Sequence, residues 1–159
     1  HAGDVIEISA PTGEFTLDAK ESMPVVFLAE RLGIAPVFTM VDALAVENPA
    51  RSVTVLYSTV DGEHFPFEAP LRHVVSRLPD GKLGVFFSKP LDTDEERVHY
   101  DVEGEIDVPR QKDLAFVDDA DYFVAGPAEF VRKTTEQLIG LGVIHSRIHA
   151  QAIECGSAR

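Results

Sequence analysis

Residues 24–36 read Pro-Val-Val-Phe-Leu-Ala-Glu-Arg-Leu-Gly-Ile-Ala-Pro. The first six residues are apolar, include two β-branched valines and are too few for a helix, which is typical of a strand buried on both faces of a parallel sheet. Apolar residues then recur at helical spacing over 32–46, and Pro36 suits the first turn of a helix. A buried strand followed at once by a helix predicts the first half of a βαβ unit.

The same alternation continues along the chain. Strands are expected over residues 52–58, 83–88, 122–125 and 147–154, and helices over 67–78 and 128–141. This order predicts an α/β protein: a doubly wound, Rossmann-like, five-stranded parallel sheet with helices on both faces. Upstream, residues 5–9 and 14–18 read as two short strands around a turn at 11–13, so residues 1–20 are expected to form a β segment before the main domain at 21–159.

Composition narrows the classes of function. The chain of 159 residues has 27 acidic and 14 basic residues, a net charge of −13, which argues against nucleic acid or an anionic membrane as the main partner. The single cysteine, Cys155, rules out an internal disulfide and a zinc site built on a cysteine pair. The longest apolar run, residues 24–29, is far shorter than the ~20 residues that span a bilayer, and the chain opens without a leader pattern. We therefore expect a cytoplasmic protein.

Much of the negative charge lies in one segment. Residues 89–121 contain twelve acidic and four basic residues. Two interpretations stay open: a solvated excursion at the edge of the sheet, or a docking face for a basic protein partner.

The predicted sheet gives candidate ligand-binding residues. Doubly wound sheets bind ligands beyond the carboxyl ends of their strands, where the strand order reverses. A helix starting near Ile34 would offer free backbone N–H groups to an anion, and Gly33 would let the backbone approach a phosphate. The sequence contains no P-loop, nucleophile elbow or zinc-protease motif, and the scattered histidines, including His145 and His149, favour structural roles over metal binding. The candidate cofactor-binding residues are Arg31, Gly33, Ile34, Pro36, Ser58, Ala125, Gly126 and Pro127.

Several stretches, in this order and spacing, resemble the C-terminal reductase part of flavohemoglobins, within the ferredoxin-reductase-like superfamily. They are residues 3–15, 24–28, 101–107, 119–127, 141–143 and 147–149. The resemblance implies that residues 1–20 are the last strands of a flavin-binding barrel and that residues 21–159 form the NAD(P)-binding reductase domain.

The resemblance also implies an electron-transfer chain. NAD(P)H reduces FAD, and FAD reduces a heme in a globin domain that oxidises nitric oxide. The family's Arg-x-Tyr-Ser flavin motif is absent from this chain, so FAD is expected only with a missing upstream flavin-binding domain, and heme only in a partner globin domain. An active chain would then be an NAD(P)H-dependent flavin oxidoreductase module of the nitric oxide dioxygenase type.

Three positions depart from the family pattern. The family's Gly-Gly-x-Gly-x-Thr-Pro loop reads Glu-Arg-Leu-Gly-Ile-Ala-Pro over residues 30–36, its cysteine beside the nicotinamide is Ala125, and its C-terminal aromatic is missing from 150–154. Glu30 adds a negative charge where a pyrophosphate would lie, and Arg31 could offset it with a bidentate phosphate contact.

Three hypotheses follow: a working nicotinamide-binding module, a degenerate domain that serves as a scaffold or docking module without cofactor turnover, and a different small-molecule binder on the same fold. For a working module, NADH is favoured over NADPH. Asp61 follows Tyr57, Ser58 and Thr59, and no Arg or Lys lies nearby in sequence to hold a 2′-phosphate.

Overall fold

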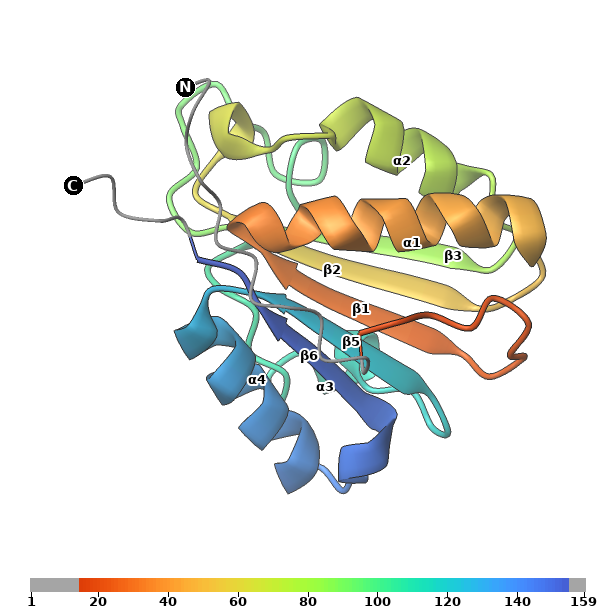
Figure 1. Cartoon of the computed structure of the whole chain (residues 1–159). Coiled ribbons are helices and arrows are strands. Elements are labelled where there is room, and N and C mark those ends of the chain that lie inside the picture. The colour runs from red at the N-terminus through yellow and green to blue at the C-terminus, as the bar shows by residue number, and fades with distance from the viewer. Residues whose placement is uncertain (1–14, 155–159) are drawn as a thin grey trace.

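The computed structural model describes residues 15–154, which form one six-stranded, all-parallel sheet with the order β4-β3-β2-β1-β5-β6 (Figure 1). The strands are β1 Val25–Glu30, β2 Val53–Thr59, β3 Gly81–Phe87, β4 Val102–Glu103, β5 Asp121–Gly126 and β6 Ile148–Ala152. The predicted doubly wound α/β class is confirmed. The sheet has one strand more than expected, because β4 is a two-residue edge strand beside Phe86 and Phe87 and is too short to show a period in the sequence.

Helices cover both faces of the sheet, as predicted. The helices are α1 Ile34–Glu47, α2 Glu68–Ser76, α3 Lys112–Ala115 and α4 Ala128–Gly140, with 3₁₀ turns η1 Arg31–Gly33, η2 Gly62–His64 and η3 His145–Arg147. α1 and α2 lie on one face, and α4 lies on the other with α3 (Figure 1). Within the described residues, no helix combines the length and the apolar character needed to cross a membrane.

Alternate residues of the central strands enter two separate cores. On β1, Val25, Phe27 and Ala29 face α1 and α2, whereas Val26 and Leu28 face α4. All of these side chains are at most 1% exposed, which explains why the strand is apolar without alternation.

The acidic segment 89–121 is not only a solvated excursion at the edge of the sheet, because part of it is packed in the core. Ile106, Val108, Ala115 and Ala120 are buried in the core on the α4 face, so the segment covers part of the sheet. The apolar residues between the acidic ones were the sequence signal for this packing. The acidic side chains around them are mostly exposed.

The predicted upstream strands are only partly testable. The expected strand at 5–9 lies outside the described residues, and the prediction for 14–18 was wrong over its described part, because residues 15–18 form no strand. Phe15 instead packs edge-on against Phe123 of β5, with ring centroids 5.5 Å apart.

Side chains from the turn after α1 hold this N-terminal segment. The buried guanidinium of Arg51 donates from Nε to the carbonyl of Met23 (2.6 Å) and from Nη1 to that of Asp18 (3.1 Å). The amide of Asn48 donates to the carbonyls of Ala19 and Glu21, both at 3.1 Å. These carbonyls are thus satisfied by side chains rather than by a neighbouring strand.

Candidate functional site

The carboxyl ends of β1 and β5 meet at the point where the strand order reverses. The chain moves outward from β1 through β2 and β3 on one side, and continues on the other side with β5 and β6. This is the crevice in which open α/β sheets bind ligands.

The turn after β1 is held by its own hydrogen bonds. Arg31 has a φ of 52°, in the left-handed region that non-glycine residues seldom adopt. Its carbonyl accepts a hydrogen bond from the buried hydroxyl of Tyr57 on β2 at 3.1 Å, and the N–H of Ile34 donates back to the carbonyls of Arg31 and Leu32. The N–H of Ile34, expected to be free for a phosphate, is therefore already used within η1.

Gly33 is required for packing. A Cβ at this position would lie 2.0 Å from the backbone oxygen of Ala125 and 2.8 Å from the backbone nitrogen of Gly126. Both atoms belong to β5 and cannot move aside as a flexible side chain could. The glycine thus allows the start of α1 to contact the end of β5, where it is buried. The phosphate contact expected at Gly33 stays a prediction.

Gly126 makes the matching contact from the other side. A Cβ there would lie 3.0 Å from the carbonyl oxygen of Glu30 and 2.9 Å from the ring of Phe130. The two glycines together bring η1 against the beginning of α4. Side chains from β1, η1 and α4 consequently share one groove.

That groove is a cavity of about 270 Å³ between η1, the start of α4 and the segment after β4. Its lining residues are Glu30, Arg31, Glu105, Ile106, Pro127, Glu129, Phe130 and Lys133. α4 has 13 residues and begins after Pro127 without a side-chain cap, so the N–H groups of its first turn and its positive dipole end lie at the groove. This combination of helix start and cationic side chains suits an anionic group such as a diphosphate.

The electrostatics of the groove centre on Glu30. Partial burial, and then the nearby carboxylate of Glu105, raise the pKa of Glu30 above its ordinary value, whereas Arg31 and Lys133 act in the opposite direction. Burial also raises the pKa of Tyr57 to about 12, and the charge of Glu30 adds to that increase. Tyr57 therefore keeps its proton, and its hydrogen bond to the Arg31 carbonyl, through the physiological range.

The remaining predicted residues take different places. Ser58 is buried at the end of β2, where it pairs in register with Glu30, and Ala125 is buried in β5. Pro36 lies half-buried in the first turn of α1. Of the predicted set, the structure brings only Arg31 and Pro127 into the lining of the groove.

Two charged residues of the groove were missed. Lys133 lies four residues after Glu129, a spacing that places both on one face of the predicted helix, so this signal was present in the sequence. Glu105 follows the unpredicted strand β4, and only that pairing brings it to the groove.

Comparison with known proteins gives the family. No model of a known protein family matches the chain. The flavohemoprotein of Rhizobium meliloti is 34% identical over 149 residues, which are 94% of this chain and 37% of that protein. The flavohemoprotein of Bordetella pertussis is 30% identical over 154 residues, which are 97% of this chain and 38% of that protein.

The chain is a flavohemoprotein homologue. It spans less than two-fifths of the length of these relatives. The flavohemoglobin of Malassezia yamatoensis, solved with FAD and heme, has a TM-score of 0.72 at 22% identity, covering 87% of this chain and 33% of that one. The FAD/NAD-binding domain of the nitric oxide dioxygenase from Vibrio cholerae has a TM-score of 0.70 at 22% identity, covering 87% and 53%. The chain shares its fold with parts of these two proteins.

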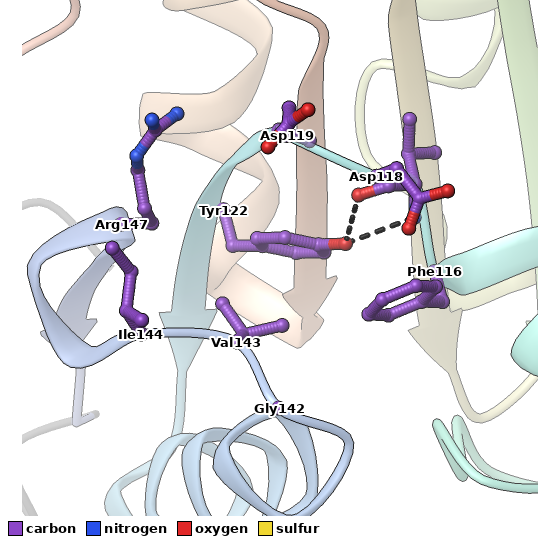
Figure 2. Close-up of a pocket in the computed structure, with 10 residues that line it drawn as sticks. Phe116, Asp118, Asp119, Tyr122, Gly142, Val143, Ile144 and Arg147 are labelled. Atoms are coloured by element: carbon purple, nitrogen blue, oxygen red, sulfur yellow. Dashed lines mark hydrogen bonds between the residues drawn. The ribbon is translucent and has the colours of Figure 1, made fainter.

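This flavohemoprotein homologue has a second cavity, of about 240 Å³, at the opposite edge of the sheet (Figure 2). It lies before β5 and β6, and Tyr122 crosses its middle, with Val143 and Phe116 below the ring in the view of Figure 2. The Tyr122 hydroxyl donates to the Val117 carbonyl at 2.8 Å and accepts from the Val117 N–H at 2.9 Å. Its polar centre is thus engaged with the backbone, and its position at the amino ends of the strands is unsuited to the ligand site of this fold.

The histidines singled out in the sequence occupy separate places in the homologue. The ring of His149 stacks on Phe123 with centroids 4.6 Å apart, and its Nε2 lies 3.7 Å from a carboxylate oxygen of Asp121. His145 begins the short turn η3. Over residues 15–154, no three His, Cys, Asp or Glu side chains are grouped as they would be around a metal ion.

Proposed function

We propose that this chain is the nicotinamide-dinucleotide-binding half of a flavohemoprotein-like oxidoreductase acting in the cytoplasm. The observation that carries the proposal is the groove at the β1–β5 switch point. Its two cations and the start of α4 offer a site for the diphosphate of a dinucleotide. Homology to flavohemoproteins over almost the whole chain supports the same assignment.

In this proposal the residues of the chain bind and position the nucleotide, and the cofactors carry out the redox chemistry. Arg31 would contact the diphosphate, and Pro127, with Gly126 and Ala125 before it, would bound the nicotinamide end. When bound in an upstream flavin-binding domain, FAD would accept hydride from NADH and pass electrons to a heme, in a globin domain, for nitric oxide detoxification. Those two domains are the proposed partners.

NADH is the proposed nucleotide rather than NADPH. Asp61 is buried after β2, where its Oδ1 accepts hydrogen bonds from the N–H groups of Glu63 and His64, and this carboxylate would repel a 2′-phosphate. The structure brings one basic residue, Lys89, next to Val60, although the two are far apart in the sequence. The backbone of Lys89 donates to the carbonyl of Val60 at 2.9 Å, so a comparison of the two nucleotides is part of the test.

One observation favours the alternative, a degenerate domain that acts as a scaffold or docking module. Glu30 lies in the groove as a third carboxylate beside Glu105 and Glu129, so acids outnumber the two bases there. In that case the exposed acids of residues 89–121 would offer the docking face for a basic protein partner.

Calorimetric titration with NADH and with NADPH distinguishes these functions. We expect NADH to bind in the micromolar to sub-millimolar range, NADPH to bind more weakly, and Arg31→Ala to lose about tenfold in NADH affinity, or ~1.4 kcal/mol. The control is Lys82→Ala, which removes one exposed cation near the amino end of β3, at the edge of the sheet away from the groove. No heat with NADH up to several millimolar would contradict the proposal and favour the scaffold.

A further inference from the structure

The groove holds an arrangement of charge that a glycine-rich loop would not have. Two cations, Arg31 from η1 and Lys133 from α4, share it with three carboxylates, those of Glu30, Glu105 and Glu129. The side chains come from separate elements, so the fold and not local sequence brings them together. An anion entering the groove would meet both attraction and repulsion from these side chains.

Glu30 is central to this arrangement. It is the last residue of β1, it is half-buried, and the backbone of Gly126 packs against its Cβ and carbonyl. The carboxylate therefore stays at the groove and cannot swing into solvent as freely as an exposed one.

Charged or titratable groups face Glu30 from several of the elements around it. Arg31 faces it from η1, Lys133 from α4, Glu105 from the segment after β4, and Tyr57 from β2. Glu129 lines the same cavity from the first turn of α4. Of these, the two cations favour the ionised form of Glu30, whereas burial and Glu105 favour the neutral form.

We propose that the groove binds the diphosphate of a nucleotide through Arg31 and Lys133 together, and that Glu30 sets the affinity, weak when it is ionised and strong when it is neutral. The inference rests on the proposed function and adds to it a second phosphate-binding residue and a control by pH. Side chains would replace the backbone N–H groups of the family's glycine-rich loop.

The direction of the pH effect follows from the environment of Glu30. Burial and Glu105 raise its pKa, so it gains a proton at a higher pH than an ordinary glutamate does. The diphosphate of a dinucleotide or of ADP-ribose is esterified at both ends and has no weakly acidic proton, so it keeps its charge through the mildly acidic range. Affinity therefore increases as the pH falls, and the increase disappears when residue 30 carries no charge.

The test is calorimetric titration of the chain with ADP-ribose from pH 5.5 to 8. This probe carries the diphosphate of NADH and lacks the acid-labile dihydronicotinamide. We expect Glu30→Gln to bind about tenfold more tightly than the native chain at pH 7.5, with a flat pH profile. We expect Lys133→Gln to bind about tenfold more weakly, with the native pH dependence. These fold-changes correspond to about 1.4 kcal/mol each.

Two matched variants control for net charge. Glu47→Gln removes an exposed carboxylate at the far end of α1, and Lys82→Gln removes an exposed cation near the far end of β3. Both should follow the native affinity and pH profile.

The outcomes separate the two proposals. If the native chain binds ADP-ribose but Glu30→Gln has the same affinity and pH dependence, the role of Glu30 is wrong and the proposed function survives. If Lys133→Gln binds as the native chain does, Lys133 is not part of the site. If neither the native chain nor Glu30→Gln binds at any pH, the proposed function fails as well. Binding by Glu30→Gln alone would support both proposals.

Discussion

Replacing Gly33 by alanine tests the contact that builds the groove. The added Cβ would lie 2.0 Å from the oxygen and 2.4 Å from the carbonyl carbon of Ala125. The closer of these distances is about 1.4 Å short of the 3.4 Å at which ordinary contact begins. Because the obstructing atoms are backbone in a strand paired on both sides, η1 and the start of α1 must shift instead.

Overpacking of this kind costs ~1–3 kcal/mol, and a clash with backbone belongs at the upper end. We therefore expect Gly33→Ala to lower the free energy of unfolding by about 3 kcal/mol. With an m-value of roughly 2 kcal/mol/M, the midpoint of urea unfolding falls by about 1.5 M. NADH affinity should fall in the same variant, since Arg31 moves with η1.

Gly140→Ala provides the matched control. Gly140 is the last residue of α4, and a Cβ there meets nothing within 4 Å, so alanine should stabilise by ~0.4–1 kcal/mol through the unfolded chain. The reasoning is refuted if Gly33→Ala unfolds at the native urea concentration, or if both glycine variants shift the midpoint equally.

Two further predictions concern buried polar groups. Arg51→Met removes the hydrogen bond to the Met23 carbonyl and the 3.6 Å ion pair with Asp121. The free energy of unfolding, measured by urea titration, should therefore fall by ~2–3 kcal/mol. A change below ~0.5 kcal/mol would show that Arg51 does not hold the N-terminal segment. Tyr57→Phe removes the hydrogen bond to Arg31 and should cost ~1 kcal/mol near neutral pH. Burial raises the pKa of Tyr57 in the folded chain from 10.0 to about 12. The free energy of unfolding of the native chain should therefore decline between these pH values as Tyr57 ionises in the unfolded chain, and Tyr57→Phe should flatten that decline. If Tyr57→Phe leaves the pH dependence of stability unchanged, the hydroxyl lies in solvent.

The sequence predicted most of the sheet, for identifiable physical reasons. Buried parallel strands such as β1 are continuous apolar runs, and α4 has a clear helical period, so both were found within a residue or two. The two-residue strand β4 and the packing of Ile106 and Val108 were not found, because they depend on contacts far apart in the chain. The strand expected at 14–18 is not formed over residues 15–18, and the carbonyl of Asp18 accepts a hydrogen bond from the side chain of Arg51 instead of from a neighbouring strand.

The site was harder to predict than the fold. Strand ends predicted a crevice at the carboxyl edge of the sheet, but they did not indicate which atoms are already hydrogen-bonded or packed there. In the sequence, Gly33 and Ile34 were candidates for phosphate contact. The structure adds that Gly33 packs tightly against β5 and that the N–H of Ile34 is hydrogen-bonded within η1, neither of which the sequence pattern indicated. Lys133 and Glu105 reach the groove only through tertiary packing.

The most direct test of the central claim is a map of amide chemical shifts in the ¹⁵N-labelled chain during titration with NADH. The account predicts the largest changes at Arg31, Glu105, Glu129 and Lys133, around the groove at the carboxyl ends of β1 and β5. Changes centred on residues 117–122 and 142–147, at the cavity of the opposite edge, would contradict it, as would an unchanged spectrum at saturating NADH.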